Sequence, residues 1–289
     1  MAAVVFGVLA GALFGAYAVA VRSALERGAD ARIGAFVVPF VAVMLLVPPA
    51  VVAAAVEGVD SGDLWPFALA GVLAPGLSQV FFILAVRDTG PSRAAILIGM
   101  VPLISVAIAL VVLDEPLRPL LLVGTGLVVG GGIVLARERE RPEHFRVVGV
   151  AYALLCAVLF AVRDNVVRWA ARGTHPPPLV AAAVSLAAAT IALGGYLLVT
   201  RADVRAHGRL ALRAFAPAGV ALGVAYAFLL EAFDRGRVSI VAPLNATQSL
   251  WAVLIATLLV GRATEMIGRR LVVAGMLVVA GAAFIGAVR

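Results

Sequence analysis

Residues 2–21, AAVVFGVLAGALFGAYAVAV, contain no charged side chain, and the first charge of the chain follows at Arg22. A helix of about 20 apolar residues is long enough to cross the roughly 30 Å hydrocarbon core of a bilayer. Lipid offers no partners for backbone N–H and C=O groups, so such a run has to be helical. This stretch therefore predicts a membrane-spanning helix.

Similar apolar runs recur along the rest of the chain, and Gly, Pro or charged residues separate them. Together they predict ten spans, at residues 2–21, 33–55, 64–86, 94–113, 119–136, 147–169, 178–200, 213–232, 238–260 and 266–288. The connectors between them are too short to hold a soluble catalytic domain. The sequence thus predicts an all-α integral membrane protein with ten transmembrane helices.

The composition supports this prediction, because 63% of the residues are hydrophobic and only 13% are charged. Soluble domains have about 25% charged residues. A soluble enzyme, a disordered chain and a disulfide scaffold are therefore excluded, and we expect a lipid bilayer as the main partner. The net charge of +7 is carried by arginines in the connectors, so it indicates no nucleic-acid partner.

The arginines also predict the orientation in a cell inner membrane. Connectors and the adjoining span ends on one side of the ten predicted spans carry 16 Arg, and the other side carries 6. Positive residues accumulate on the cytoplasmic side of membrane proteins. Both termini, which lie on the Arg-poor side, are therefore predicted to be non-cytoplasmic.

The two halves of the chain resemble each other at an offset of 146 residues. The matched pairs are Phe14 with Phe160, Tyr17 with Arg163, and Arg22 with Arg168. The charged segment 137–146 separates the halves, which we predict as five-helix repeats at 1–140 and 147–289. Because five is odd, the second repeat enters the membrane from the opposite side, and inverted repeats of this kind are typical of transporters.

Both halves also resemble a known family. The first half contains AAILIGMVP (94–102), LDEP (113–116) and LLVGTG (121–126), and the second contains APLN (242–245), LLVG (258–261) and a glycine-flanked helix from Gly275 to Gly281. This order is similar to the EamA-type repeat of the drug/metabolite transporter superfamily, and it covers nearly the whole chain. One departure is Arg262, which stands where the first half has the loop acid Glu115.

The resemblance implies a ten-helix carrier with a central cavity that exports amino acids or other small metabolites, and the aromatic amino-acid exporters are the nearest type. An intramembrane lipid-modifying enzyme and a lipid flippase are the alternatives from other classes. The three His residues show no metal-ligand spacing, so we expect no metal, no cofactor and no catalytic residue. The sequence does not indicate the oligomeric state.

Span 64–86 contains Pro75-Gly76, which predicts a kink, because Pro removes a helical hydrogen bond. Ser78, Gln79 and Phe82 follow on one helix face. This face either lines a substrate cavity or forms hydrogen bonds between helices, which contribute about 0.6 kcal/mol each in membranes.

Span 238–260 contains a second polar face, formed by Asn245 and Gln248, with Trp251 nearby. An unpaired amide is costly in hydrocarbon, so we expect this face to point inward. The hypothesis is a central cavity shared by Gln79 and Gln248. Trp251 is either a ring on which a substrate stacks or a ring packed in the core.

Span 147–169 places Tyr152 and Arg163 on one stripe. Asp164 is predicted to pair with Arg168 at i, i+4, which leaves Arg163 without a local acid partner. Arg163 then either binds a substrate carboxylate or extends to the outer membrane interface. Tyr17, its repeat equivalent, and Tyr226 complete the predicted binding residues, since aromatic rings with a polar tip suit amphipathic substrates as well as ordinary packing.

Overall fold

The structure, a computed structural model, describes residues 2–101, 103–104, 108, 119–136, 145–170, 174, 176–235, 244–245, 247–259 and 268–288. Most of these residues are helical, as the sequence predicts. The elements are α1 (Ala2–Glu26), α2 (Ala31–Glu57), η1 (Ser61–Asp63), α3 (Trp65–Gly71), η2 (Val72–Leu77), α4 (Ser78–Thr89), α5 (Pro91–Ile98), α7 (Pro119–Ala136), α8 (Val147–Ala170), α9 (Pro178–Val199), α10 (Val204–Arg235), α12 (Gln248–Leu259) and α14 (Arg269–Val288).

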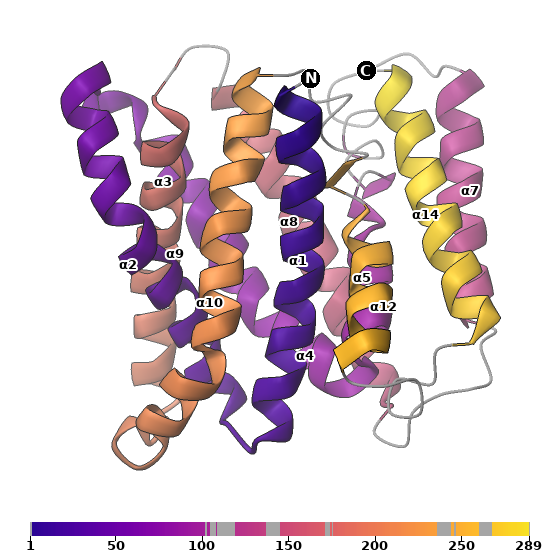
Figure 1. The fold of residues 1–289 in the computed structure, drawn as a ribbon, viewed down its shortest axis with the longest axis horizontal. Coiled ribbons are helices and arrows are strands. Elements are labelled where there is room, and N and C mark those ends of the chain that lie inside the picture. Colours follow the sequence, from indigo (N-terminus) through magenta and orange to yellow (C-terminus); the bar gives the residue numbers. More distant parts are fainter. Residues whose placement is uncertain are drawn as a thin grey trace.

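The helices run alongside one another in a bundle (Figure 1). α1 lies near the middle and packs against α10 and α12, while α8 packs against α4. α2 packs against α9 and α10 on one side of the bundle, and α7 pairs with α14 at the opposite edge. α1 begins and α14 ends at the same end of the molecule (Figure 1).

Six helices of the described residues are long and apolar enough to cross a membrane. They are Ala2–Glu26, Ala31–Glu57, Ser61–Thr89, Val147–Val167, Pro178–Val199 and Val204–Ala232. Large apolar side chains on the outside are open to the surroundings, with Ile191 76% and Leu258 73% exposed. Such a surface is unfavourable in water and favourable in lipid, so the chain is a multi-pass membrane protein. The number ten remains a prediction, because the predicted spans 94–113, 238–260 and 266–288 include residues outside the described ranges.

Several predicted boundaries differ from the structure. α1 continues to Glu26, and α5 ends at Ile98 within the predicted span 94–113. The sequence also predicts a connector at residues 201–212, but α10 already begins at Val204. Asp203 caps this helix, because its Oδ1 accepts a hydrogen bond of 3.0 Å from the backbone N–H of Ala206. Charged residues end the apolar span there without ending the helix, which extends beyond the hydrocarbon.

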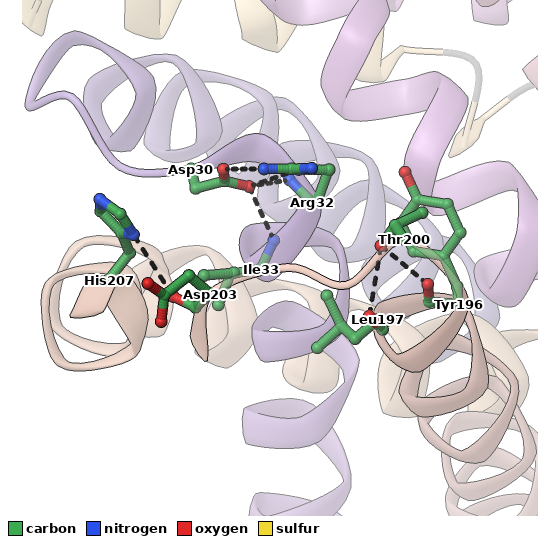
Figure 2. Close-up of polar contacts among 8 residues, drawn as sticks. All are labelled: Asp30, Arg32, Ile33, Tyr196, Leu197, Thr200, Asp203 and His207. Carbon is green, nitrogen blue, oxygen red and sulfur yellow. Dashed lines mark hydrogen bonds and ion pairs between the residues drawn. The ribbon is translucent and has the colours of Figure 1, made fainter. Parts of the chain in front are cut away.

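Two helix starts lie at the end of the molecule opposite the termini. Asp30 caps α2, and its Oδ1 accepts hydrogen bonds from the backbone N–H groups of Arg32 (2.8 Å) and Ile33 (3.2 Å). Figure 2 shows this cap together with Thr200, whose hydroxyl donates to the Tyr196 carbonyl at 2.8 Å, and the start of α10. The α1–α2 and α9–α10 connectors therefore share one end, as the predicted topology requires.

Candidate functional site

The helix that follows η1 is broken where the sequence predicts a kink. α3 passes into the π-helical turn η2, and Ala74 has the non-helical dihedrals φ −150° and ψ 121°. The Ala74–Pro75 peptide bond is cis. Ser78 and Gln79 begin the next helix, α4, and both are buried, as is Phe82 one turn later. The break thus places this polar face inside the bundle.

The first polar pair at the break joins α1 to α4. The Tyr17 hydroxyl donates a hydrogen bond of 2.9 Å to Oε1 of Gln79. The Tyr17 ring stacks on Phe82, with ring centroids 4.5 Å apart and an interplanar angle of 16°. These three predicted binding residues therefore form one buried cluster.

The second polar pair joins α8 to α10 and reaches the same break. Nη1 of Arg163 donates to the Tyr226 hydroxyl at 2.6 Å, and this hydroxyl donates to the Ala74 carbonyl at 3.0 Å. The guanidinium also lies over the Phe160 ring, 5.1 Å from its centroid. Phe14 packs edge-on against Tyr226, with centroids 6.4 Å apart. Four helical segments, α1, η2, α8 and α10, therefore meet here.

The sequence-based view of Arg163 needs two corrections. Asp164 is its ion-pair partner, because Nε of Arg163 lies 2.9 Å from Oδ1 of Asp164. The predicted Asp164–Arg168 pair involves a side chain outside the described residues. Arg163 is 7% exposed, so it points into the bundle and does not extend to the interface. An arginine within a span costs about 2.5–3.5 kcal/mol on insertion scales, which makes Arg163 a candidate functional residue.

Several buried polar atoms at the break have no hydrogen-bond partner. They are Oγ of Ser78, Nε2 of Gln79 and Nε of Arg163. The Nε–H group of Arg163 lies close to Asp164 but is not aligned with the carboxylate, so the ion pair forms without a hydrogen bond. Each unsatisfied buried group costs about 1–3 kcal/mol. These three groups are therefore available to form hydrogen bonds with a bound molecule.

The two polar pairs occupy corresponding positions in the two halves. The partners are separated by 62 residues in the Tyr17–Gln79 pair and by 63 in the Arg163–Tyr226 pair. The correspondence of Tyr17 with Arg163 is visible in the sequence. The correspondence of Gln79 with Tyr226 is not, because the offset there is 147 residues and the side chains differ.

Two ring pairs repeat the correspondence between the halves. Phe6 of α1 packs against Phe228 of α10, with centroids 5.5 Å apart. Tyr152 of α8 stacks on Phe81 of α4 at 6.2 Å. Tyr152 corresponds to Phe6 at an offset of 146, and Phe228 corresponds to Phe81 at 147. One ring pair thus joins α1 to α10 and the other joins α8 to α4, at positions related by nearly the same offset.

The predicted residues of span 238–260 pack on another part of α1. Trp251 and Gln248 are half-buried, and α12 approaches α1 so closely that a Cβ on Gly15 would lie 2.7 Å from Trp251 Cβ. Asn245 is half-buried and leaves its buried Oδ1 without a partner. The cavity shared by Gln79 and Gln248 stays a prediction.

The sequence analysis missed the feature that positions α12, which is a stripe of small residues on α1. Gly7, Gly11 and Gly15 recur every four residues and face Leu244, Thr247 and Trp251. Small residues at this spacing let two membrane helices approach closely. The signal is present in the sequence as GxxxGxxxG and could have predicted the contact surface of α1.

The helical bundle with a polar site at a helix break defines a class, the multi-pass membrane proteins that carry a buried polar site within the bilayer. The model of the EamA-like transporter family matches the chain twice, at residues 1–137 and 147–287. The chain belongs to this family.

Comparison with solved structures supports the same architecture. Seventeen chains of known structure match. One of them, described only as "Crystal structure of protein", is 25% identical, with a TM-score of 0.65 over 98% of this chain and 95% of that chain. No curated protein matches the chain.

Proposed function

We propose that this protein is a secondary transporter of the inner membrane that exports small metabolites, amino acids foremost, by alternating access. The observation that carries the proposal is the meeting of two corresponding polar pairs, Tyr17–Gln79 and Arg163–Tyr226, at the helix break around Ala74. Membrane transporters bind their substrates where repeats meet and where a helix is interrupted.

The paired contacts support two five-helix inverted repeats. The Phe6–Phe228 and Phe81–Tyr152 ring pairs are reciprocal, since each repeat contributes the same two positions. Reciprocal contacts are what a pseudo-twofold relation between two bodies produces. In such an arrangement, exchanging the conformations of the two repeats opens the same site to the other side of the membrane.

The site is closed by the packing of the surrounding helices, and we propose the break as the point at which they separate. Tyr17, Gln79, Phe82, Arg163 and Tyr226 are all buried against neighbouring helices, so a substrate reaches them only when helices separate. The non-helical backbone of Ala74 within η2 and the missing N–H group of Pro75 make this the position where the helix bends most easily. We propose that α4 tilts at this break during transport.

The ring content supports an amphipathic substrate, because Phe14, Tyr17, Phe82, Phe160 and Tyr226 surround the polar atoms. The most specific substrate class that we propose is the aromatic amino acids. The EamA-like family is one of transporters, which favours a carrier over the lipid-modifying enzyme or flippase.

Transport by the purified chain in proteoliposomes tests the proposal. We expect counterflow of labelled amino acids that empty liposomes lack. Gln79→Ala should reduce the rate more than it lowers thermal stability, because it removes an amide from the site. We expect the same of Gln248→Ala, because the predicted cavity is shared by Gln79 and Gln248. Thr257→Val is the matched control, since its hydroxyl bonds to the Val253 carbonyl of its own helix at 2.7 Å.

Two outcomes would contradict this proposal. The carrier function is wrong if no member of a broad panel of amino acids, organic acids and amines moves across the membrane. The site assignment is wrong if both Gln variants transport at the wild-type rate.

A further inference from the structure

The two corresponding polar pairs differ by one charge. The first half contributes a neutral pair, in which a Tyr hydroxyl bonds to a Gln amide. The second half contributes a cation, in which the Arg163 guanidinium bonds to the Tyr226 hydroxyl. The second pair therefore brings a cation and its partner Asp164 to the site, whereas the first pair is neutral.

Negative charge is scarce around this cation. Asp88 is the buried acid among the described residues, but it lies nine residues beyond Gln79 on α4, about 14 Å along a helix. Its carboxylate is already paired with Arg87 at 2.7 Å. Asp164 is 35% exposed at its side chain and is the partner of Arg163 itself. Neither carboxylate is left over for a cationic substrate group.

The unpaired donors lie around the same break. Gln79 keeps a free Nε2 amide while its Oε1 is engaged by Tyr17, and Arg163 keeps an unaligned Nε–H group. Ser78, beside Gln79, adds a hydroxyl without a partner.

We infer that the site recognises the carboxylate of its substrate and that the substrate needs no ammonium group. This inference rests on the proposed transport function and specifies its substrate class as monocarboxylates with an apolar body. The guanidinium offers five N–H donors, of which Tyr226 engages one, and it matches a carboxylate in shape and charge.

The remaining groups complete the recognition of such a molecule. The Gln79 amide and the Ser78 hydroxyl supply donors for a carboxylate oxygen that the guanidinium leaves unpaired. Phe14, Phe82 and Phe160 surround these donors with rings against which an apolar body packs. Within the described residues no carboxylate is left there to pair with an ammonium group, so its desolvation is not offset.

Matched compound sets test this inference on the purified full chain. Each set shares one apolar body and consists of an amino acid, the carboxylic acid without the amine, and the amine without the carboxylate. We use L-phenylalanine, 3-phenylpropionate and 2-phenylethylamine, and the corresponding sets built on leucine and alanine. Affinity is read from the shift of thermal unfolding in detergent and from inhibition of counterflow in proteoliposomes.

In at least one set, the acid without the amine should bind within a few fold of the amino acid, and the amine should bind roughly ten- to hundredfold more weakly. Arg163→Gln should remove this preference, and Arg163→Lys should keep it with lower affinity. Arg235→Gln is the matched control, because Arg235 is a half-exposed arginine paired with Glu231 outside the site. If Arg163→Gln does not fold, the order of affinities in the wild type and in Arg163→Lys still tests the inference.

The failure of this inference can be separated from failure of the transport function. Transport that prefers amines, or that strictly needs the ammonium group, overturns the inference and leaves the carrier function standing. Binding of none of the three sets also overturns it. The absence of transport for every compound class overturns both.

Discussion

The Tyr226 hydroxyl forms hydrogen bonds with two groups at the break. It accepts from the Arg163 guanidinium and donates to the Ala74 carbonyl, which Pro75 leaves outside the regular helical pattern. Hydrogen bonds between neutral groups in membranes contribute about 0.6 kcal/mol on average, whereas bonds to charged groups contribute roughly 1.5–3 kcal/mol. The hydrogen bond to the charged Arg163 therefore makes the larger contribution of Tyr226 to stability.

We predict that Tyr226→Phe destabilises the protein by about 1.5–3 kcal/mol, because it leaves Arg163 and the Ala74 carbonyl with fewer partners. The measurement is thermal unfolding in detergent, where the midpoint should fall by several degrees. Tyr196→Phe is the control, since Tyr196 is half-buried near the end of α9 and outside the site. Equal midpoints for the two variants would show that the hydroxyl has no structural role.

Asp30 gives a prediction on pH. Burial raises the pKa of its carboxyl, but the hydrogen bonds from Arg32 and from the backbone N–H of Ile33 outweigh burial and hold the pKa below its ordinary value of 3.8. A lowered pKa means that the charge stabilises the fold above about pH 4 and that this contribution disappears as the pH falls through the folded-state pKa.

We therefore predict that wild type is more stable than Asp30→Asn at neutral pH and that the two converge below about pH 4. Asn keeps the capping oxygen, so Asp30→Ala should lose about a further 1 kcal/mol at every pH. Unfolding midpoints of the three proteins across pH 3–8 provide the measurement. A constant gap between wild type and Asp30→Asn down to pH 3 would contradict the prediction.

At the scale of elements, the contact between α1 and α12 depends on glycine. A Cβ at Gly15 would lie 2.7 Å from the backbone nitrogen of Ala252, which cannot move aside as a side chain does. Glycine is unfavourable within a helix by roughly 0.5–1 kcal/mol relative to alanine. The close approach of the two helices is therefore the reason that glycine is needed at this position.

Gly15→Ala and Gly195→Ala should change stability in opposite directions. The first variant pushes α12 away from α1 and should lower the unfolding midpoint, with a cost of about 1–3 kcal/mol for overpacking. The second lies in α9 with nothing within 4 Å of an added Cβ, so the gain in helix propensity should raise the midpoint slightly. If both variants raise it, α12 does not pack on this face of α1.

At the scale of the whole molecule, the ends of α2 report the orientation of the chain. Arg27, just before this helix, and Glu57, its last residue, are both exposed and lie at opposite ends of the molecule. The excess of arginine in connectors on the Arg27 side predicts that this side is cytoplasmic.

Cysteine labelling of intact cells tests the orientation. In a Cys156→Ser background, which removes the buried native thiol, Glu57→Cys should react with a membrane-impermeant maleimide. Arg27→Cys should react only after the membrane is permeabilised. The reverse pattern would place both termini in the cytoplasm and invert every connector assignment.

The helical class, the approximate spans and the break at Pro75-Gly76 follow from the sequence, because each depends on local physics: the length of apolar runs, the absence of backbone partners in lipid and the missing N–H group of proline. The matching of Tyr17 with Arg163 also follows, since it needs only a constant offset. The connector at 201–212 was mispredicted because charge ends an apolar run but does not end a helix.

Only the tertiary structure decided which polar groups meet. Helix periodicity assigns Gln79 to a face but does not say that the facing group is the Tyr17 hydroxyl, 62 residues away, or that Tyr226 reaches the Ala74 carbonyl across 152 residues. The sequence predicts no acid partner for Arg163, yet Nε of Arg163 lies 2.9 Å from Oδ1 of Asp164. Such choices depend on how whole helices pack against one another, because in a bilayer a buried donor takes the nearest acceptor that a neighbouring helix presents.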